Sequence, residues 1–289
     1  MEALLQDPRV QSAAAPFVVA VLLAGVLRYL GGARGAVLAG LAVLAGLFVA
    51  YWLVLGAPAW PPRGASHKIA YIVLAAGVLG LLLDLGRIPP LGVRIAVAVG
   101  GFAGAVWLMG ARLDPGDPMT WLWPGLPIVL VWIGVLGWLE RRRTEPLAAP
   151  ALLVVAAVGA SFVALFGRSA SIAQLSGALA AATAGYAIWN WPVARMDLAR
   201  AALFAAGAAW LGLMTQMFLF TRAEPWALAA LVLVFVADQP AARGAARFLP
   251  SNNWFGRAVG PFAHGALVAI PAAIAVFIAS ALASPSSGY

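Results

Sequence analysis

Residues 35–56 read GAVLAGLAVLAGLFVAYWLVLG, a run of twenty-two positions without a charged side chain. An α-helix rises about 1.5 Å per residue, so about 20 apolar residues cross the roughly 30 Å hydrocarbon core of a bilayer. The run ends at Gly56, and Pro58 follows two residues later, where a helix stops readily. This stretch therefore predicts a transmembrane helix.

The same test applied outward along the chain finds nine more segments. The ten predicted spans are 13–31, 35–56, 68–86, 91–110, 121–139, 147–167, 171–192, 201–221, 225–239 and 258–282. The ninth is short, so it either tilts little or extends through Gln239 toward Ala245. Since every connection is brief, we expect an all-α transmembrane bundle of about ten spans, with residues 1–289 forming a single integral membrane domain.

Composition supports the same class. The chain is 64% hydrophobic and 10% charged, whereas soluble proteins carry about 45 to 50% apolar and about 25% charged residues. A soluble fold of this length could not cover so much apolar surface. The chain has no cysteine, which excludes disulfides, zinc-thiolate sites and a cysteine nucleophile. We expect neither a metal nor another cofactor.

Basic residues predict the orientation. The formal net charge is +8, but the arginines lie singly or in threes at the ends of apolar runs, so nucleic acid is not an expected partner. Twelve lie at the odd-numbered connections: Arg28, Arg34, Arg87, Arg94, Arg141, Arg142, Arg143, Arg195, Arg200, Arg243, Arg247 and Arg257. The other six basic residues are Arg9, Arg63, Lys68, Arg112, Arg168 and Arg222. The positive-inside rule then places both termini outside the cytoplasm, and the Arg- and Ala-rich composition indicates a bacterial inner membrane.

A weak internal repeat relates residues 13–139 to residues 147–282. Trp60-Pro61 and Lys68 precede the third span much as Trp191-Pro192 and Arg200 precede the eighth. Because each segment holds an odd number of spans, two such repeats would be inverted relative to each other, as in many secondary transporters. Chance similarity between two Ala-, Val-, Leu- and Gly-rich segments is the alternative.

Four polar residues are candidates for a substrate path. Thr215 and Gln216 are predicted near the middle of the eighth span, where an amide needs a protein partner. His264 lies about two turns into the last span, and Asn190 lies near the end of the seventh. Hydrogen bonds between helices are the alternative for Thr215 and Gln216, and packing without a nearby carboxylate is the alternative for His264.

A second set of candidates lies near the predicted cytoplasmic face. Asp84 and Arg87 are three residues apart, a spacing that lets them pair on one helix face. The polar cluster also includes Asp238, Gln239, Asn252 and Asn253, with arginines nearby. Such a loop could bind an anionic headgroup or a small anion. Its alternative role is a positive-inside anchor.

No motif identifies a reaction, since HExxH, Walker A and GxSxG patterns are absent from the sequence. The leading hypothesis is a secondary transporter or permease for a small molecule. A non-catalytic subunit that packs against partner membrane proteins is the first alternative. An intramembrane enzyme that acts on lipid-linked substrates is the second, and the missing nucleophile or metal cluster argues against catalysis.

Overall fold

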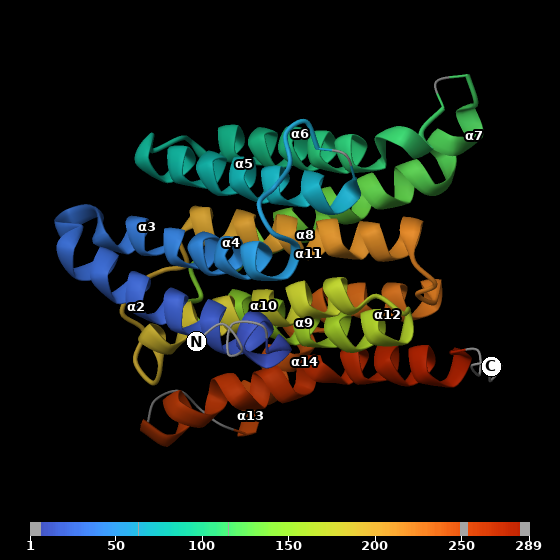
Figure 1. Ribbon diagram of the computed structural model, residues 1–289. Coiled ribbons are helices and arrows are strands. Elements are labelled where there is room, and N and C mark those ends of the chain that lie inside the picture. The colour runs from blue at the N-terminus through green and yellow to red at the C-terminus, as the bar shows by residue number, and fades with distance from the viewer. Residues whose placement is uncertain (1–6, 63, 115, 249–253, 284–289) are drawn as a thin grey trace.

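The computed structural model describes residues 7–62, 64–114, 116–248 and 254–283, and all regular elements in these ranges are helical (Figure 1). The helices are α2 (Ala15–Leu30, preceded by a π-helical turn at Val10–Ala14), α3 (Gly35–Ala39), α4 (Leu41–Leu55), α5 (Ala65–Leu85), α6 (Pro90–Met109), α7 (Pro118–Thr120), α8 (Leu126–Arg141), α9 (Ala148–Phe166), α10 (Ala170–Ala187), α11 (Arg200–Phe220), α12 (Pro225–Val236), α13 (Asp238–Phe248) and α14 (Trp254–Leu282). Figure 1 shows the long helices lying side by side along a common direction.

Eight helical segments in the described part of the chain are long and apolar enough to cross a membrane. The pair α12 and α13, bent by 49° at Ala237, gives a ninth if it is counted as one span. The bend explains why the ninth predicted span, 225–239, is short: the helix changes direction at Ala237 instead of continuing straight. The seventh predicted span, 171–192, coincides with α10, which is not among these segments. It carries Gln174, Ser176 and Thr183 and packs against α2, α4 and α9.

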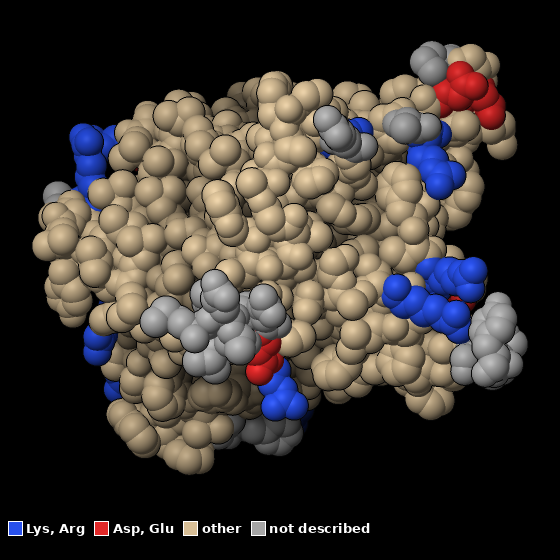
Figure 2. Space-filling model, viewed as in Figure 1, with Lys and Arg blue, Asp and Glu red and all other residues tan. Residues whose placement is uncertain are grey.

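The outer surface has the character of a lipid-facing surface. Leu22, Leu91, Leu130 and Phe277 are each at least 60% exposed, and water would disfavour a continuous apolar belt of this kind. In Figure 2 most charged side chains on the visible face lie toward the two ends of the bundle, with uncharged surface between them. A multi-pass membrane protein accounts for this pattern, since ionised groups are costly at mid-bilayer depth.

Helix α11 forms the centre of the bundle. Every residue from Ala201 to Thr215 is buried, including the whole indole of Trp210. A helix that is apolar on all sides belongs in a core, and the many alanines of α11 let neighbouring helices approach closely. Helices from both predicted repeats surround it. From the first repeat, α4, α5, α6 and α8 pack on α11, and from the second, α9 and α10 do so.

Helices α5 and α11 pack antiparallel along most of their length. Gly80 of α5 lies against the first residue of α11, Arg200, and Ile69 near the start of α5 lies against Gly212. We call the end of the bundle where α5 and α8 finish and α11 begins the charged end. The opposite end is where α5 begins at Ala65 and α11 finishes at Phe220.

Replacing Gly80 with alanine is expected to destabilise the protein. A Cβ atom there would lie 2.3 Å from the carbonyl oxygen of Arg200, which is backbone and cannot turn aside. Overpacking of this kind costs about 1 to 3 kcal/mol. The control is Gly134→Ala in α8, where a Cβ meets nothing within 4 Å, and which should stabilise the helix by about 0.5 to 1 kcal/mol. Thermal unfolding in detergent, followed by tryptophan fluorescence, compares them; equal midpoints would contradict the close packing.

Candidate functional site

The first group of buried charges is centred on Arg200. Its Nε and Nη2 atoms donate to Glu140 Oε1 at 2.9 and 2.7 Å, and its Nη1 donates to Asp84 Oδ1 at 2.6 Å. The three side chains are 15%, 18% and 6% exposed, respectively. We call Asp84, Glu140 and Arg200 the Arg200 network. The planar guanidinium of Arg200 binds both carboxylates at once through separate N–H groups, whereas the single ammonium of a lysine lacks this fork.

Helix ends bring the Arg200 network together. Asp84 lies in the last turn of α5, Glu140 lies in the last turn of α8, and Arg200 begins the antiparallel helix α11. The Arg200 backbone N–H donates to Asp84 Oδ2 at 2.8 Å, so the carboxylate also satisfies one of the unpaired N–H groups at the start of α11. An anionic group at a helix N-terminus is further stabilised by the helix dipole.

The predicted pair Asp84–Arg87 is wrong, because Asp84 pairs with Arg200. Helix α5 ends at Leu85, and Arg87 has a φ of +50° in the turn that leads to α6. Since Arg87 is outside the helix, the three-residue spacing no longer places it on the face of Asp84. Arg87 is exposed.

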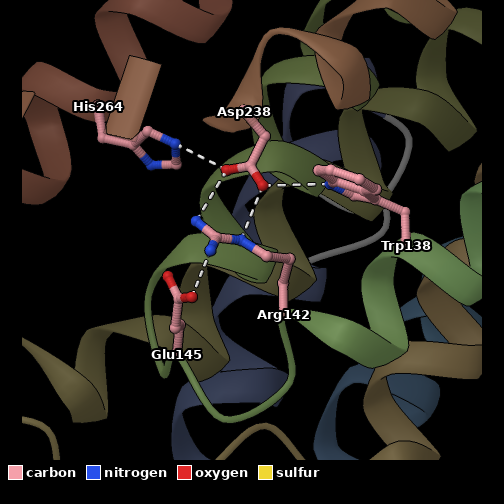
Figure 3. A network of polar contacts seen from close by, with 5 residues as sticks. All are labelled: Trp138, Arg142, Glu145, Asp238 and His264. Atoms are coloured by element: carbon pink, nitrogen blue, oxygen red, sulfur yellow. Dashed lines mark hydrogen bonds and ion pairs between the residues drawn. The ribbon is translucent and has the colours of Figure 1, made fainter. Parts of the chain in front are cut away.

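The second group surrounds Asp238, whose side chain is fully buried. Arg142 Nε lies 2.7 Å from Asp238 Oδ2, and Trp138 Nε1 donates to the same oxygen at 3.1 Å. Arg142 Nη2 donates to Oδ1 at 3.2 Å, and His264 Nε2 lies 3.0 Å from Oδ1. Figure 3 shows these side chains converging on Asp238, with Glu145 paired to the far side of Arg142. We call Trp138, Arg142, Asp238 and His264 the Asp238 network.

His264 therefore has a carboxylate partner, which corrects the expectation of a histidine without one. An ionised carboxylate only accepts hydrogen bonds, so Nε2 carries the proton in the His264–Asp238 bond. Gln239 is exposed and takes no part in the network. Asn252 and Asn253 lie outside the described residues.

The candidate path residues do not line one route. Thr215 accepts a hydrogen bond from Trp132 Nε1 at 3.0 Å, and Gln216 donates to Ser66 Oγ at 2.6 Å near the opposite end. Both residues lie within two turns of the end of α11 rather than at its middle. Asn190 is fully buried after α10, where its Oδ1 accepts from the backbone N–H groups of residues 195 and 196.

The Trp132–Thr215 bond should be measurable as an energetic coupling. Thr215→Val keeps the side-chain shape but leaves a buried indole N–H without an acceptor, whereas Trp132→Phe removes the donor. A double-mutant cycle in detergent is expected to give a coupling of about 0.6 to 1.7 kcal/mol, the range for such bonds in membrane bundles. Additive effects of the two substitutions would show that the bond contributes nothing.

Two apolar cavities lie on either side of Trp132. One, of about 330 Å³, lies among α5, α6, α8 and α11 and includes Gly100 and Gly104 in its wall. The other, of about 380 Å³, lies among α8, α11 and α12 and reaches Thr215. Apart from the Thr215 hydroxyl and the tryptophan N–H groups, their linings are apolar. Gln216 lines neither of these two cavities.

A third cavity, of about 530 Å³, lies at the charged end beside the Asp238 network. Arg142 and His264 contribute to its wall, together with Arg257 near the start of α14. It differs from the other two because charged side chains form part of its lining.

Sequence reasoning did not select Arg200, Glu140, Arg142 and Trp138 as candidate residues. The sequence does contain a pattern that points to these residues. Asp84, Glu140 and Asp238 all fall at span ends that the count of basic residues assigns to the same side of the membrane. Carboxylates and arginines confined to one end of a bundle have strong reason to pair there. Among the described residues, no cluster of three or more His, Asp or Glu side chains could hold a metal ion.

No protein-family model matches the chain, and no curated protein matches it.

Proposed function

We propose that this membrane protein is a secondary carrier for a small molecule and that the two networks close it at the charged end. The basic residues support an orientation with the charged end in the cytoplasm and both termini on the other side, in a bacterial inner membrane with ten spans. The fully buried Asp238 and the nearly buried Asp84 are the kind of groups that mark a functional region in a membrane protein.

The observation that carries the proposal is where the ion pairs lie. Arg200 of α11 pairs with Asp84 and Glu140 of the segment α2–α8, and Arg142 at the end of α8 pairs with Asp238 of the segment α9–α14. The Arg200–Asp84 pair therefore joins the two predicted repeats, and the pairs of Glu140 and Arg142 tie the connection between the repeats to the second one at the same end. At the opposite end the contact between these segments includes the neutral Gln216–Ser66 bond and a bond from Arg112 to the Leu219 carbonyl. A carrier that alternates between two states needs strong, breakable contacts of this kind at one end.

Helix pairing supports the inverted repeat. The predicted counterparts α5 and α11 are both 21 residues long and pack antiparallel at the centre, as helices related by an axis in the membrane plane must. The pairs α2–α4 and α6–α8 correspond to α9–α10 and α12–α14, and each pair is in contact. The two apolar cavities beside Trp132 favour a small apolar or amphipathic substrate, since neither would replace the water around a strongly polar solute.

The absence of cysteine from the sequence allows a direct test. Ala201→Cys places a reporter at a fully buried position beside Arg200, and Ser66→Cys places one at a partly exposed position of the opposite end. Each single variant is reconstituted in liposomes and labelled with a membrane-impermeant maleimide, with and without Glu140→Gln. Weakening the Arg200 network should raise labelling at position 201 and lower it at position 66. A factor of about ten corresponds to a shift of about 1.4 kcal/mol between two states.

Met119→Cys, at a position 63% exposed, controls for general changes in reactivity. Reciprocal changes at the two ends indicate alternating access, and uptake of a panel of small amphipathic compounds into the same liposomes then identifies substrates. Labelling that rises at both ends indicates loosening of the fold. Labelling that changes at neither end would overturn the carrier proposal in favour of a packing subunit.

A further inference from the structure

The cavity of about 530 Å³ at the charged end has the features of an anion site. Its polar wall consists of Arg142, Thr144, Glu145, Arg257 and His264. Two of these are arginines, and the one carboxylate, Glu145, is paired with Arg142. The volume lies within the range of about 300 to 1,000 Å³ that is typical of small-molecule sites.

The remainder of the wall is apolar and comes from α13, from α14 and from the chain segments before α9 and after α10. Ala242, Ala245 and Ala246 of α13 face the cavity, with Pro146 and Leu147 on another side. A site with a charged part and an apolar part favours an amphipathic ligand, with an anionic group at one end and an apolar group at the other. A phosphate attached to a glycerol backbone and acyl chains has this character, whereas a free inorganic anion does not use the apolar wall.

Helix α13 has the geometry of an interfacial helix. It turns away from α12 by 49° instead of extending it. Ala241 and Ala245 are buried, whereas Gln239, Arg243 and Arg247, which follow one another at intervals of four residues, are exposed. Helices with a basic face of this kind lie at the headgroup level and attract anionic lipids. Helix α13 packs against α14, beside which it lies in Figure 1.

The charge around the cavity is positive. Arg142 and Arg257 in the wall, with Arg243 and Arg247 on the exposed face of the neighbouring helix α13, contribute four formal positive charges, and Asp238 and Glu145 contribute two negative charges. Asp238 is fully buried behind Arg142 and His264, so it is shielded from the cavity. Figure 3 shows that the second ring nitrogen of His264 does not point at Asp238.

We propose that this cavity binds the phosphate-bearing headgroup of an anionic phospholipid. The phosphodiester lies against Arg257, and the glycerol and upper acyl carbons lie against the alanines of α13. Guanidinium groups bind phosphate oxygens through charge-assisted hydrogen bonds, often in pairs. The inference does not depend on the carrier proposal, because binding can occur whether or not the bundle alternates.

The test measures lipid binding by the whole chain in detergent. Short-chain phosphatidylglycerol, phosphatidylcholine and inorganic phosphate are titrated separately, and the midpoint of thermal unfolding reports binding to the folded state. Phosphatidylglycerol is expected to raise the midpoint, and phosphatidylcholine of the same chain length is not. A rise with inorganic phosphate alone, and no further rise with the lipid, would replace the lipid with a soluble phosphate compound.

Two variants separate charge from shape. Arg257→Gln should weaken phosphatidylglycerol binding by about tenfold or more, the loss expected for a charge-assisted hydrogen bond. Ala246→Trp fills the cavity without changing charge and should weaken binding by a similar factor. The matched control is Arg222→Gln, which removes one arginine at the opposite end, where it lines a cavity of about 170 Å³, and should bind as the native chain does.

The outcomes are distinguishable. If Arg257→Gln and Ala246→Trp both bind phosphatidylglycerol as tightly as Arg222→Gln does, the lipid binds elsewhere and the proposal is overturned. Each variant is first compared with the native chain in the absence of lipid, so that a change in intrinsic stability is not read as a change in binding. Uptake and cysteine labelling are not used, so failure of the carrier proposal leaves this result intact.

Discussion

Asp238→Ala is expected to lower the free energy of unfolding by about 3 to 5 kcal/mol, the usual effect of removing one partner of a buried ion pair. The substitution leaves the Arg142 guanidinium, the Trp138 N–H and the His264 N–H directed at an empty space, because all three donate to this carboxylate. The carboxylate is fully buried, so water does not readily take its place. Unfolding in mixed micelles, followed by tryptophan fluorescence, measures the loss.

Asp238→Asn tests whether the charge or the size matters. An amide of the same shape offers one oxygen to the donors, but its NH2 group faces other donors and cannot bond to them. We therefore expect the asparagine variant to lose most of the stability that the alanine variant loses. Glu145→Gln is the control, because Glu145 is 48% exposed and pairs with the same arginine; exposed pairs contribute only about 0 to 1 kcal/mol. A loss no larger in Asp238→Ala than in Glu145→Gln would contradict the structure of this network.

The membrane-spanning helices could be predicted from the sequence because the bilayer sets a local requirement. A segment either has about 20 apolar residues or it does not, and residues 35–56 and 201–221 meet this requirement without reference to any other part of the chain. The helices Gly35–Leu55 and Arg200–Phe220 lie within one residue of these bounds. The departures occur where tertiary contacts decide, as in α10, whose Gln174 and Ser176 are accommodated by packing among other helices.

The networks could not be predicted in the same way. Asp84 and Arg200 are 116 positions apart, and the sequence does not state which helices are neighbours. Basic-residue counting places both near one side of the membrane, but it does not bring them within hydrogen-bond distance. The closeness of Arg87 to Asp84 in sequence predicts a pair that does not form, because the helix ends between them.

His264 shows the same limit. Its partner Asp238 is 26 residues earlier, in a different helix, and the two meet because α13 packs against α14. The bend between α12 and α13 sets the position of Asp238, and hydrophobic periodicity does not report a bend of this kind. The sequence therefore predicts well which segments cross the membrane and poorly which of their polar ends meet.

Arg200→Met is expected to lower the free energy of unfolding by about 3 to 5 kcal/mol, because it leaves the nearly buried Asp84 without a cation and leaves Glu140 with Arg143 alone, 3.7 Å away. The matched control is Arg87→Met, which removes the arginine nearest to Asp84 in sequence but outside the helix. Surface substitutions of this kind change stability by less than about 0.5 kcal/mol. Arg200→Lys should fall between the two, since one ammonium cannot reproduce the fork that binds both carboxylates.

A triple variant separates two quantities: the net contribution of the ion pairs to stability, and the cost of leaving a buried charge unpaired. In Arg200→Met with Asp84→Asn and Glu140→Gln, no ionised side chain of the network is left without its counter-charge, so much of the stability lost in Arg200→Met alone should return. Neutral replacement of a whole buried network is often harmless to stability. Restored stability together with faster labelling of Ala201→Cys would mean that the charges serve to close this end rather than to hold the fold. If Arg200→Met is no less stable than Arg87→Met, the Arg200 network stabilises neither the fold nor a closed state, and the proposed closure at the charged end loses one of its two supports.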